Sequence, residues 1–161
     1  MEEIYKKYSK PVYRYLYSLT KDHELSEELM QETFCSAIKG IKNFRKECSV
    51  YSWLCEIAKN KWKNYLVKKK KAKIVQFDDN IEKLLIEDTL EECVFSKGEN
   101  TELYKEMQSL DTTSYEVVHL RIYGELPFKE IGKILNKSEV WARTTFYRAK
   151  VKLKERLKNE R

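Results

Sequence analysis

The sequence predicts an all-α protein made of two small helical domains that a flexible linker joins. Charged residues make up 36% of its 161 residues, and only four glycines and two prolines interrupt the chain. Amphipathic helices with solvated faces suit this composition, whereas a β-sandwich would need many more turn residues. The charges also fall in blocks that are basic over 59–73, acidic over 78–106 and basic again toward the C-terminus. We therefore expect an N-terminal domain over 1–72, an acidic linker over 73–98 and a C-terminal domain over 99–161.

The first two elements are expected to be helices. Over 2–19 the apolar residues repeat at helical spacing, and Pro11 either weakens this helix or marks a break in it. A second helix is expected from Asp22 to Ile38, with its apolar residues facing inward. A short loop from Gly40 to Cys48 then leads to the next helix.

The third helix is expected to begin at Ser49, a plausible N-cap, and to run to about Lys69. Its apolar stripe consists of Val50, Trp53, Leu54, Ile57, Ala58, Tyr65 and Leu66. A different and mostly polar face carries side chains at i, i+3, i+4 and i+7, namely Asn60, Lys63, Asn64 and Val67. We expect a partner to bind this polar face.

The C-terminal domain has the rhythm of a helix-turn-helix. Two helices are expected over 102–110 and 114–123, and Gly124 ends the second of them as a C-cap. Pro127 then opens a short helix, and after a turn Ser138 caps a longer one. In a helix-turn-helix, the second of two such helices lies in the major groove of DNA.

The last helix separates a buried stripe from an exposed face. The stripe steps by four, three, four and four residues through Ala142, Phe146, Ala149, Leu153 and Leu157. The opposite face presents Arg143, Thr144, Tyr147 and Arg148. Because Arg and Thr side chains can bond base edges and phosphates, this face is a candidate for reading duplex DNA. The net charge of +6 agrees with a polyanionic partner but does not by itself identify one.

Several classes of function are disfavoured by what the sequence lacks. No apolar run approaches the roughly 20 residues that a transmembrane helix needs, and the N-terminus does not resemble a signal peptide, so we expect a cytoplasmic protein without membrane insertion. The four cysteines form no CxxC pair, so we expect reduced thiols in preference to the alternative of a zinc site. No glycine-rich phosphate loop, HExxH motif or nucleophile elbow is present. We expect a binding protein with no catalytic residues, metal or cofactor.

Several motifs, in the right order, resemble the extracytoplasmic-function sigma factors of the sigma-70 family. Residues 26–34 read SEELMQETF and resemble the family's core-binding helix, which typically reads AEDLVQETF. Asn43-Phe44-Arg45 and residues 53–60, WLCEIAKN, resemble its FRG…WLYRIARN segment. Residues 110–153 resemble the domain that reads the −35 promoter element. The resemblance covers both domains and leaves only the linker unmatched. It implies a sigma2-like helical bundle followed by a sigma4-like helix-turn-helix.

The resemblance also implies which residues bind which partner. Core RNA polymerase, through its β and β′ subunits, is the expected protein partner, and the surface against the β′ clamp helices would include Glu28, Gln31, Glu32 and Phe34. A flipped base of the −10 element would be captured by a loop that contains Asn43, Phe44, Arg45 and Lys46. The helix beside that loop would contribute Asn60 and Asn64, and Lys63 lies on the same polar face. The −35 contacts would be Arg143, Thr144, Tyr147 and Arg148.

Six residues depart from the family's pattern, and two of them, Lys129 and Gly132, have little expected consequence. Glu56 replaces the usual arginine, and Lys46 stands where glycine is usual, so the capture loop is expected to differ in shape. Glu139 and Trp141 replace a small or turn-forming pair at the start of the recognition helix. The tryptophan is expected to pack either on the preceding helix or on the sugar-phosphate backbone.

The predicted function is that of an alternative sigma factor, which directs core RNA polymerase to specific promoters and nucleates their opening. The resemblance further implies control by an anti-sigma factor, commonly a membrane-anchored one. Two alternatives stay open from the residues alone. One is a helix-turn-helix regulator that binds duplex DNA without polymerase, and the other is a helical adaptor that binds RNA or the ribosome.

Overall fold

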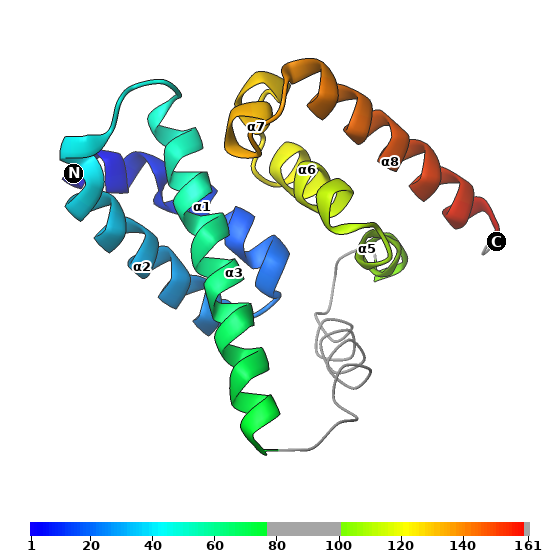
Figure 1. Cartoon of the computed structure of the whole chain (residues 1–161), viewed down its shortest axis with the longest axis horizontal. Coiled ribbons are helices and arrows are strands. Elements are labelled where there is room, and N and C mark those ends of the chain that lie inside the picture. Colours follow the sequence, from blue (N-terminus) through cyan, green and yellow to red (C-terminus); the bar gives the residue numbers. More distant parts are fainter. Residues whose placement is uncertain (77–100, 160–161) are drawn as a thin grey trace.

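The computed structural model describes residues 1–76 and 101–159, and in these ranges it contains seven α-helices, one 3-10 turn and no strand (Figure 1). The prediction of an all-α fold is therefore confirmed. The elements are α1 (Glu2–Thr20), α2 (His23–Gly40), η1 (Ile41–Asn43), α3 (Val50–Gln76), α5 (Thr101–Gln108), α6 (Thr112–Ile122), α7 (Phe128–Ile134) and α8 (Glu139–Asn159). Most of the expected acidic linker lies outside the described residues.

Helix α1 continues through Pro11, so the proline does not break it. A proline has no N–H to donate to the carbonyl four residues earlier, which here belongs to Lys7. Lys7 lies on the exposed side of the helix, where water can bond that carbonyl instead. The apolar side of α1, with Val12, Leu16 and Leu19 buried, packs against α2 and α3.

The starts of α2 and α3 follow from side-chain caps. The Asp22 carboxylate accepts a hydrogen bond from the backbone N–H of Leu25 at 3.0 Å. The Ser49 hydroxyl accepts one from the N–H of Ser52 at 3.0 Å, which confirms Ser49 as a cap. Helix α3 extends to Gln76, so the expected end near Lys69 is too early. Nothing after Lys69 is a helix breaker, because Lys and Ala are good helix formers.

In the C-terminal part, three expected boundaries are wrong by one or two residues. Helix α6 begins at Thr112 because the Asp111 carboxylate accepts a hydrogen bond from the N–H of Ser114 at 3.2 Å. Hydrogen bonds with the Ser114 side chain and with its backbone N–H lower the pKa of Asp111. Helix α5 ends at Gln108 and not at residue 110. The C-cap of α6 is Tyr123, one residue before the expected Gly124.

The helix-turn-helix formed by α7 and α8 depends on Gly132. The N–H of Lys137 donates to the Gly132 carbonyl at 2.7 Å, so the chain turns back directly over this residue. A Cβ atom at position 132 would lie 2.7 Å from the carbonyl oxygen of Lys137. Glycine therefore permits the close approach of the turn to α7, as expected where two backbones meet. Helix α8 begins as predicted, because the Ser138 hydroxyl accepts from the N–H of Trp141 at 3.0 Å.

The two halves of the chain share one apolar core. Buried residues of α1 to α3, such as Leu16 and Leu54, belong to the same cluster as Leu120, Ile131 and Ala142 of α6 to α8. In Figure 1, α6 and α7 lie beside α1 and α3, and contacts join α1 to α6 and α3 to α7. A second, smaller cluster joins α5, α6 and α8 through Met107, Leu110, Val118, Ala149 and Leu153.

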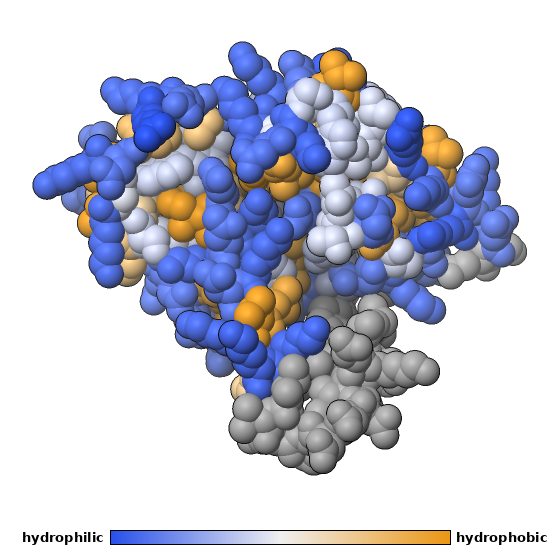
Figure 2. Space-filling model, in the orientation of Figure 1, coloured by the Kyte–Doolittle hydropathy of each residue, from blue (hydrophilic) through white to orange (hydrophobic). Residues whose placement is uncertain are grey.

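The surface is largely hydrophilic on the face that Figure 2 shows, with small apolar patches between charged side chains. This pattern is typical of helices that bury one stripe and solvate the rest. None of the helices in the described ranges is both long and apolar enough to cross a membrane.

Candidate nucleic-acid and protein interfaces

The face of α8 that the sequence predicted for duplex DNA is exposed. The four side chains Arg143, Thr144, Tyr147 and Arg148 all lie on the solvent side of the helix. Together with Val151 and Lys152 they line a shallow hollow of about 600 Å³. The opposite stripe is buried at Ala142, Ala149 and Leu153, and half-buried at Phe146 and Leu157. A helix with one packed stripe and one basic, hydrogen-bonding face has the chemistry that reading a major groove requires.

Two departures from the family's pattern take defined places at the start of α8. Trp141 is half-buried against the main apolar core, and the Lys137 ammonium lies 5.6 Å from its ring centroid. Packing within the protein, one of the two places expected for this tryptophan, is present in the structure. Glu139 forms an ion pair with Arg143 at 3.1 Å, one helical turn away. Glu139 is therefore paired with Arg143, which is one of the four residues predicted to contact DNA.

A second candidate surface runs from the loop after α2 along α3. The Phe44 ring stacks on the Trp53 ring, with centroids 4.8 Å apart and planes at 28°. Asn60 and Asn64 follow Trp53 by seven and eleven residues, which places all three on nearly the same side of α3. Seven residues correspond to a rise of roughly 10 Å. Both asparagines are exposed. We call this line of Phe44, Trp53, Asn60 and Asn64 the α3 stripe.

Lys46, in the loop that the sequence predicts to capture a base, has a backbone conformation that is typical of glycine. Lys46 has φ = 58°, in the left-handed region that favours glycine. The expected difference in shape between this loop and that of the family stays a prediction. Asn43, Arg45 and Lys46 are all exposed, whereas Phe44 is half-buried.

Lys63 points away from the α3 stripe and toward α6. It forms an ion pair with the Glu116 carboxylate, and the two side chains are 48% and 15% exposed. Lys59, one turn earlier, is buried, and this burial lowers the pKa of its ammonium while Glu116 acts in the opposite direction. The structure thus separates Lys63 from Asn60 and Asn64, with which the sequence had grouped it.

The predicted protein-binding residues form an exposed acidic and amide face on α2. Glu28, Gln31 and Glu32 are exposed, and Phe34 lies beneath them at 4% exposure. The Phe34 ring meets the Tyr5 ring edge to face, with centroids 4.9 Å apart. Phe34 is therefore part of the core and not of the outer surface of this face.

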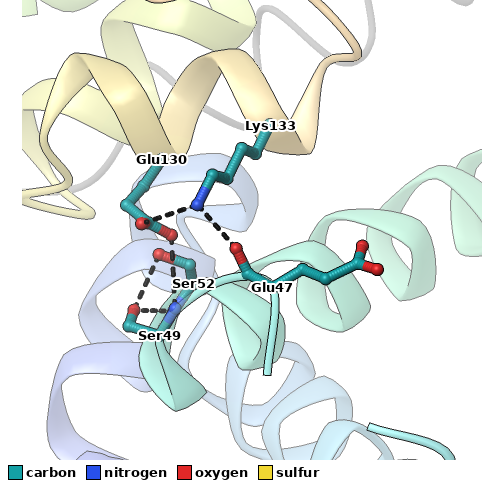
Figure 3. A network of polar contacts seen from close by, with 5 residues as sticks. All are labelled: Glu47, Ser49, Ser52, Glu130 and Lys133. Atoms are coloured by element: carbon teal, nitrogen blue, oxygen red, sulfur yellow. Dashed lines mark hydrogen bonds and ion pairs between the residues drawn. The ribbon is translucent and has the colours of Figure 1, made fainter. Parts of the chain in front are cut away.

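A polar network joins α7 to the loop before α3, and no motif in the sequence predicts it (Figure 3). The Lys133 ammonium donates to the backbone carbonyl of Glu47 at 2.5 Å and lies 3.7 Å from the Glu130 carboxylate. The same carboxylate accepts from the backbone N–H of Ser49 at 3.4 Å. Nearby, the Tyr51 hydroxyl donates to the carbonyl of Gly124 at 2.8 Å. Partners more than seventy residues apart produce no spacing signal, which is why this network was missed.

A buried histidine joins α6 to α1. The Ser18 hydroxyl donates to the carbonyl of Tyr15 at 2.6 Å, so its oxygen can accept the proton of His119 Nδ1, 3.1 Å away. The other ring nitrogen, Nε2, is buried and has no hydrogen-bond partner among the described residues. Burial, and secondarily the charge of Lys21, lower the pKa of His119 to about 3. This histidine is therefore neutral wherever the two halves stay packed.

The cysteines differ in exposure. Cys35 is exposed, Cys48 half-buried and Cys55 buried, while Cys93 lies outside the described ranges. Burial raises the pKa of the Cys55 thiol to about 12. Burial and the carboxylates of Glu130 and Glu56 raise the pKa of Cys48. No group of three or more His, Cys, Asp or Glu residues within 1–76 and 101–159 is arranged to hold a metal ion.

The sequence matches those of known sigma factors. The Sigma-70 region 2 family matches residues 4–72. The chain is 34% identical over 158 residues to the ECF RNA polymerase sigma factor SigM of Bacillus subtilis, covering 96% of this chain and 93% of that protein. It is 29% identical over 164 residues to the RNA polymerase sigma factor YlaC of the same organism, covering 100% and 94%.

Solved structures share the fold at lower sequence identity. The sigma factor RpoE of Bartonella quintana, in complex with the anti-sigma factor NepR, superposes with a TM-score of 0.69 at 18% identity, covering 99% of this chain and 98% of that one. CnrH, in complex with the cytosolic domain of CnrY, gives a TM-score of 0.67 at 18% identity and covers 99% and 88%. The arrangement of helices is thus shared across nearly the whole chain.

Proposed function

The chain belongs to the extracytoplasmic-function sigma factors of RNA polymerase, and on that premise we propose how its surfaces divide the work of initiation. The α2 face, with Glu28, Gln31 and Glu32 exposed above Phe34, binds the β′ subunit of core RNA polymerase. The α3 stripe and the capture loop bind the non-template strand of the −10 element. The exposed face of α8 reads the −35 element as duplex.

The observation that carries this proposal is that one chain presents two exposed surfaces of different chemistry, one on α8 and one along α3. The face of α8 is basic and exposed, and its guanidinium and hydroxyl groups suit base edges and phosphates in a major groove. The α3 stripe instead combines a stacked aromatic pair with two exposed amides. Amides can bond the pairing edge of a base only after it has left the duplex. A protein that reads duplex at one element and captures a base at another provides what promoter opening requires.

The energetics of opening need no nucleotide hydrolysis. Unstacking and unpairing a base costs a few kcal/mol. Hydrogen bonds from Asn60 or Asn64 and contact with the Phe44–Trp53 pair offset this cost, since they form only with the extruded base. The sigma factor therefore shifts the equilibrium toward open DNA through binding energy.

Regulation and location follow from the same proposal. Two solved structures with this fold are complexes with an anti-sigma factor or with the cytosolic domain of a partner protein. We expect a protein of that class to bind this chain and to cover its polymerase-binding surfaces. Since RNA polymerase works in the cytoplasm, the chain would act there.

The test is transcription in vitro with core RNA polymerase and a library of random promoters, followed by sequencing of the start sites. Start sites that require the protein and share two spaced upstream elements are expected. Replacement of both Arg143 and Arg148 by Ala should abolish dependence on the upstream element, with Glu155→Gln on the same helix as the matched control. If no start sites appear while the protein alone binds a specific duplex, the protein is a regulator that acts without polymerase.

A further inference from the structure

An exposed apolar side chain lies at the start of α8, beside the basic residues of that helix. Val140 is 68% exposed, the largest exposed fraction among the large hydrophobic residues of the described ranges. It precedes Arg143, Thr144 and Tyr147 by three, four and seven residues, which places it on their side of the helix. The face proposed to read the −35 element therefore begins with an apolar group.

Two contacts hold the backbone around Val140. The Ser138 hydroxyl accepts the hydrogen bond from the N–H of Trp141, and the Trp141 ring is half-buried against the main apolar core. Valine in a helix also keeps one strongly preferred χ1 rotamer. Val140 therefore presents its two methyl groups in a defined direction, and contact with a ligand would cost it little side-chain entropy.

Arg143, about one turn after Val140, is also held in place. Its guanidinium forms the ion pair with Glu139 at 3.1 Å and lies 5.7 Å from the centroid of the Phe128 ring. Val140 and Arg143 are separated by a rise of roughly 4.5 Å along the helix, and successive base pairs of duplex DNA by roughly 3.4 Å. Their side chains can therefore reach the same base pair or two neighbouring ones.

The chemistry of an exposed valine at this place matches one base. In a helix-turn-helix, the N-terminal residues of the second helix contact base edges. Thymine alone presents a C5-methyl group in the major groove, and apolar side chains contact it, whereas guanidinium groups suit the acceptors of guanine. Helix stability gives no other reason for valine here, because β-branched residues are poorer helix formers than alanine.

From these observations we propose that Val140 is a specificity-determining residue, which contacts the C5-methyl group of a thymine in the −35 element. This thymine belongs to the base pair that Arg143 reads or to a neighbouring one. The inference rests on the proposed function, because it extends the reading of the −35 element by α8. It predicts that the element contains an A·T pair whose thymine methyl group is required for full affinity.

The experiment removes the thymine methyl group and the valine side chain separately and together. Promoter duplexes obtained from the library carry deoxyuridine in place of one thymine of the upstream element at a time, on either strand. Their affinity for the holoenzyme, formed from core RNA polymerase and the full chain, is measured by competition. Deoxyuridine lacks only the C5-methyl group. At one position, or at two adjacent ones, the parent chain should lose affinity about fourfold, which corresponds to one methyl group left in water.

With Val140→Ala, deoxyuridine at that position should no longer reduce the affinity, while its effect at other positions stays as in the parent chain. Val151→Ala is the matched control, because Val151 is an exposed valine of the same helix, roughly 16 Å beyond Val140. In this variant deoxyuridine should weaken binding as much as it does in the parent chain. Alanine is the better helix former, so Val140→Ala should keep α8 intact.

The inference about Val140 is overturned if no deoxyuridine weakens binding of the parent chain. It is equally overturned if the effect of deoxyuridine is the same in Val140→Ala at every position. A uniform loss of affinity in that variant would then assign Val140 to a contact with a protein or with the DNA backbone.

The two proposals can fail separately. If start sites share an upstream element but no thymine in it depends on Val140, the proposed function stands and the inference about Val140 is wrong. If no start sites appear and the protein alone binds a specific duplex, the proposed function falls, and the same deoxyuridine series on that duplex decides the role of Val140. The absence of both start sites and duplex binding would overturn both proposals.

Discussion

His119 should make the stability of the folded chain depend on pH, and the substitution His119→Gln should remove this dependence. Its ring is buried between Tyr115 and Tyr123, with Ser18 Oγ at Nδ1 and the charge of Lys21 as a neighbour. A proton on Nε2 would place a buried positive charge where the described residues offer no acceptor. Replacing the ring with the amide of Gln keeps a donor for Ser18 but leaves nothing to protonate.

The magnitude follows from the difference in pKa between the two states. The folded value of about 3 lies below the ordinary value of 6.5, so the folded protein favours neutral histidine. The stabilisation is complete above pH 6.5 and is lost as the pH falls from there toward 3. At pH 5.5, one unit below the unfolded value, the loss is about 1.4 kcal/mol. Unfolding in urea, followed by circular dichroism at pH 7.5 and 5.5, measures this loss.

The wild-type chain should lose about 1.4 kcal/mol more between these two pH values than His119→Gln does. Other groups, such as His23 and the carboxylates, are present in both chains and cancel in the comparison. Equal losses in the two chains would show that His119 is not held neutral at the contact between α6 and α1. The same result would refute the reasoning that ties this buried nitrogen to stability.

Three substitutions test the backbone features of the two DNA surfaces, each by urea unfolding. Lys46→Gly should raise the free energy of unfolding by about 0.5–1 kcal/mol, because φ = 58° strains lysine but not glycine; a decrease would contradict this. Gly132→Ala should lower it by about 1–3 kcal/mol, since the new Cβ meets the Lys137 carbonyl at 2.7 Å; no change would mean that the turn can move. Ser138→Ala should lower it by about 1 kcal/mol through loss of the cap on Trp141 N–H, and Ser138→Thr should recover most of this.

The features that the sequence predicted well are local ones. Ser49 and Ser138 cap their helices as expected, because a hydroxyl and an N–H three residues later are neighbours in the chain. The buried stripe of α8 and its exposed face follow from a period of 3.6 residues. Where two local signals compete, the observed helix boundaries differ from the predicted ones. Asp111 caps α6, so this helix begins before Ser114, where the sequence predicted its start. Pro11 removes one hydrogen bond from α1 but does not end the helix.

The features that the sequence could not predict are contacts between distant residues. Glu116 and Lys63 read as ordinary solvated charges on two helices, and only the packing of α6 on α3 brings them together. His119 lies on a helix whose buried side was not identified in advance, so its burial was not foreseen. Lys46 illustrates a different limit. The sequence does not say whether the backbone at a glycine position changes when lysine replaces it, or whether lysine adopts the conformation of glycine. Here Lys46 adopts the left-handed conformation.

The most direct test of the account is to detect unpaired DNA at a promoter that the library experiment identifies. Permanganate oxidises thymines that have left the duplex, so its reaction maps the opened segment. We predict reactive thymines near −10 only when core RNA polymerase and this chain are both present, and weaker reactivity when Asn60 and Asn64 are both replaced by Ala. Duplex binding by the protein with no reactive thymines under any of these conditions would contradict the claim that this chain opens promoters.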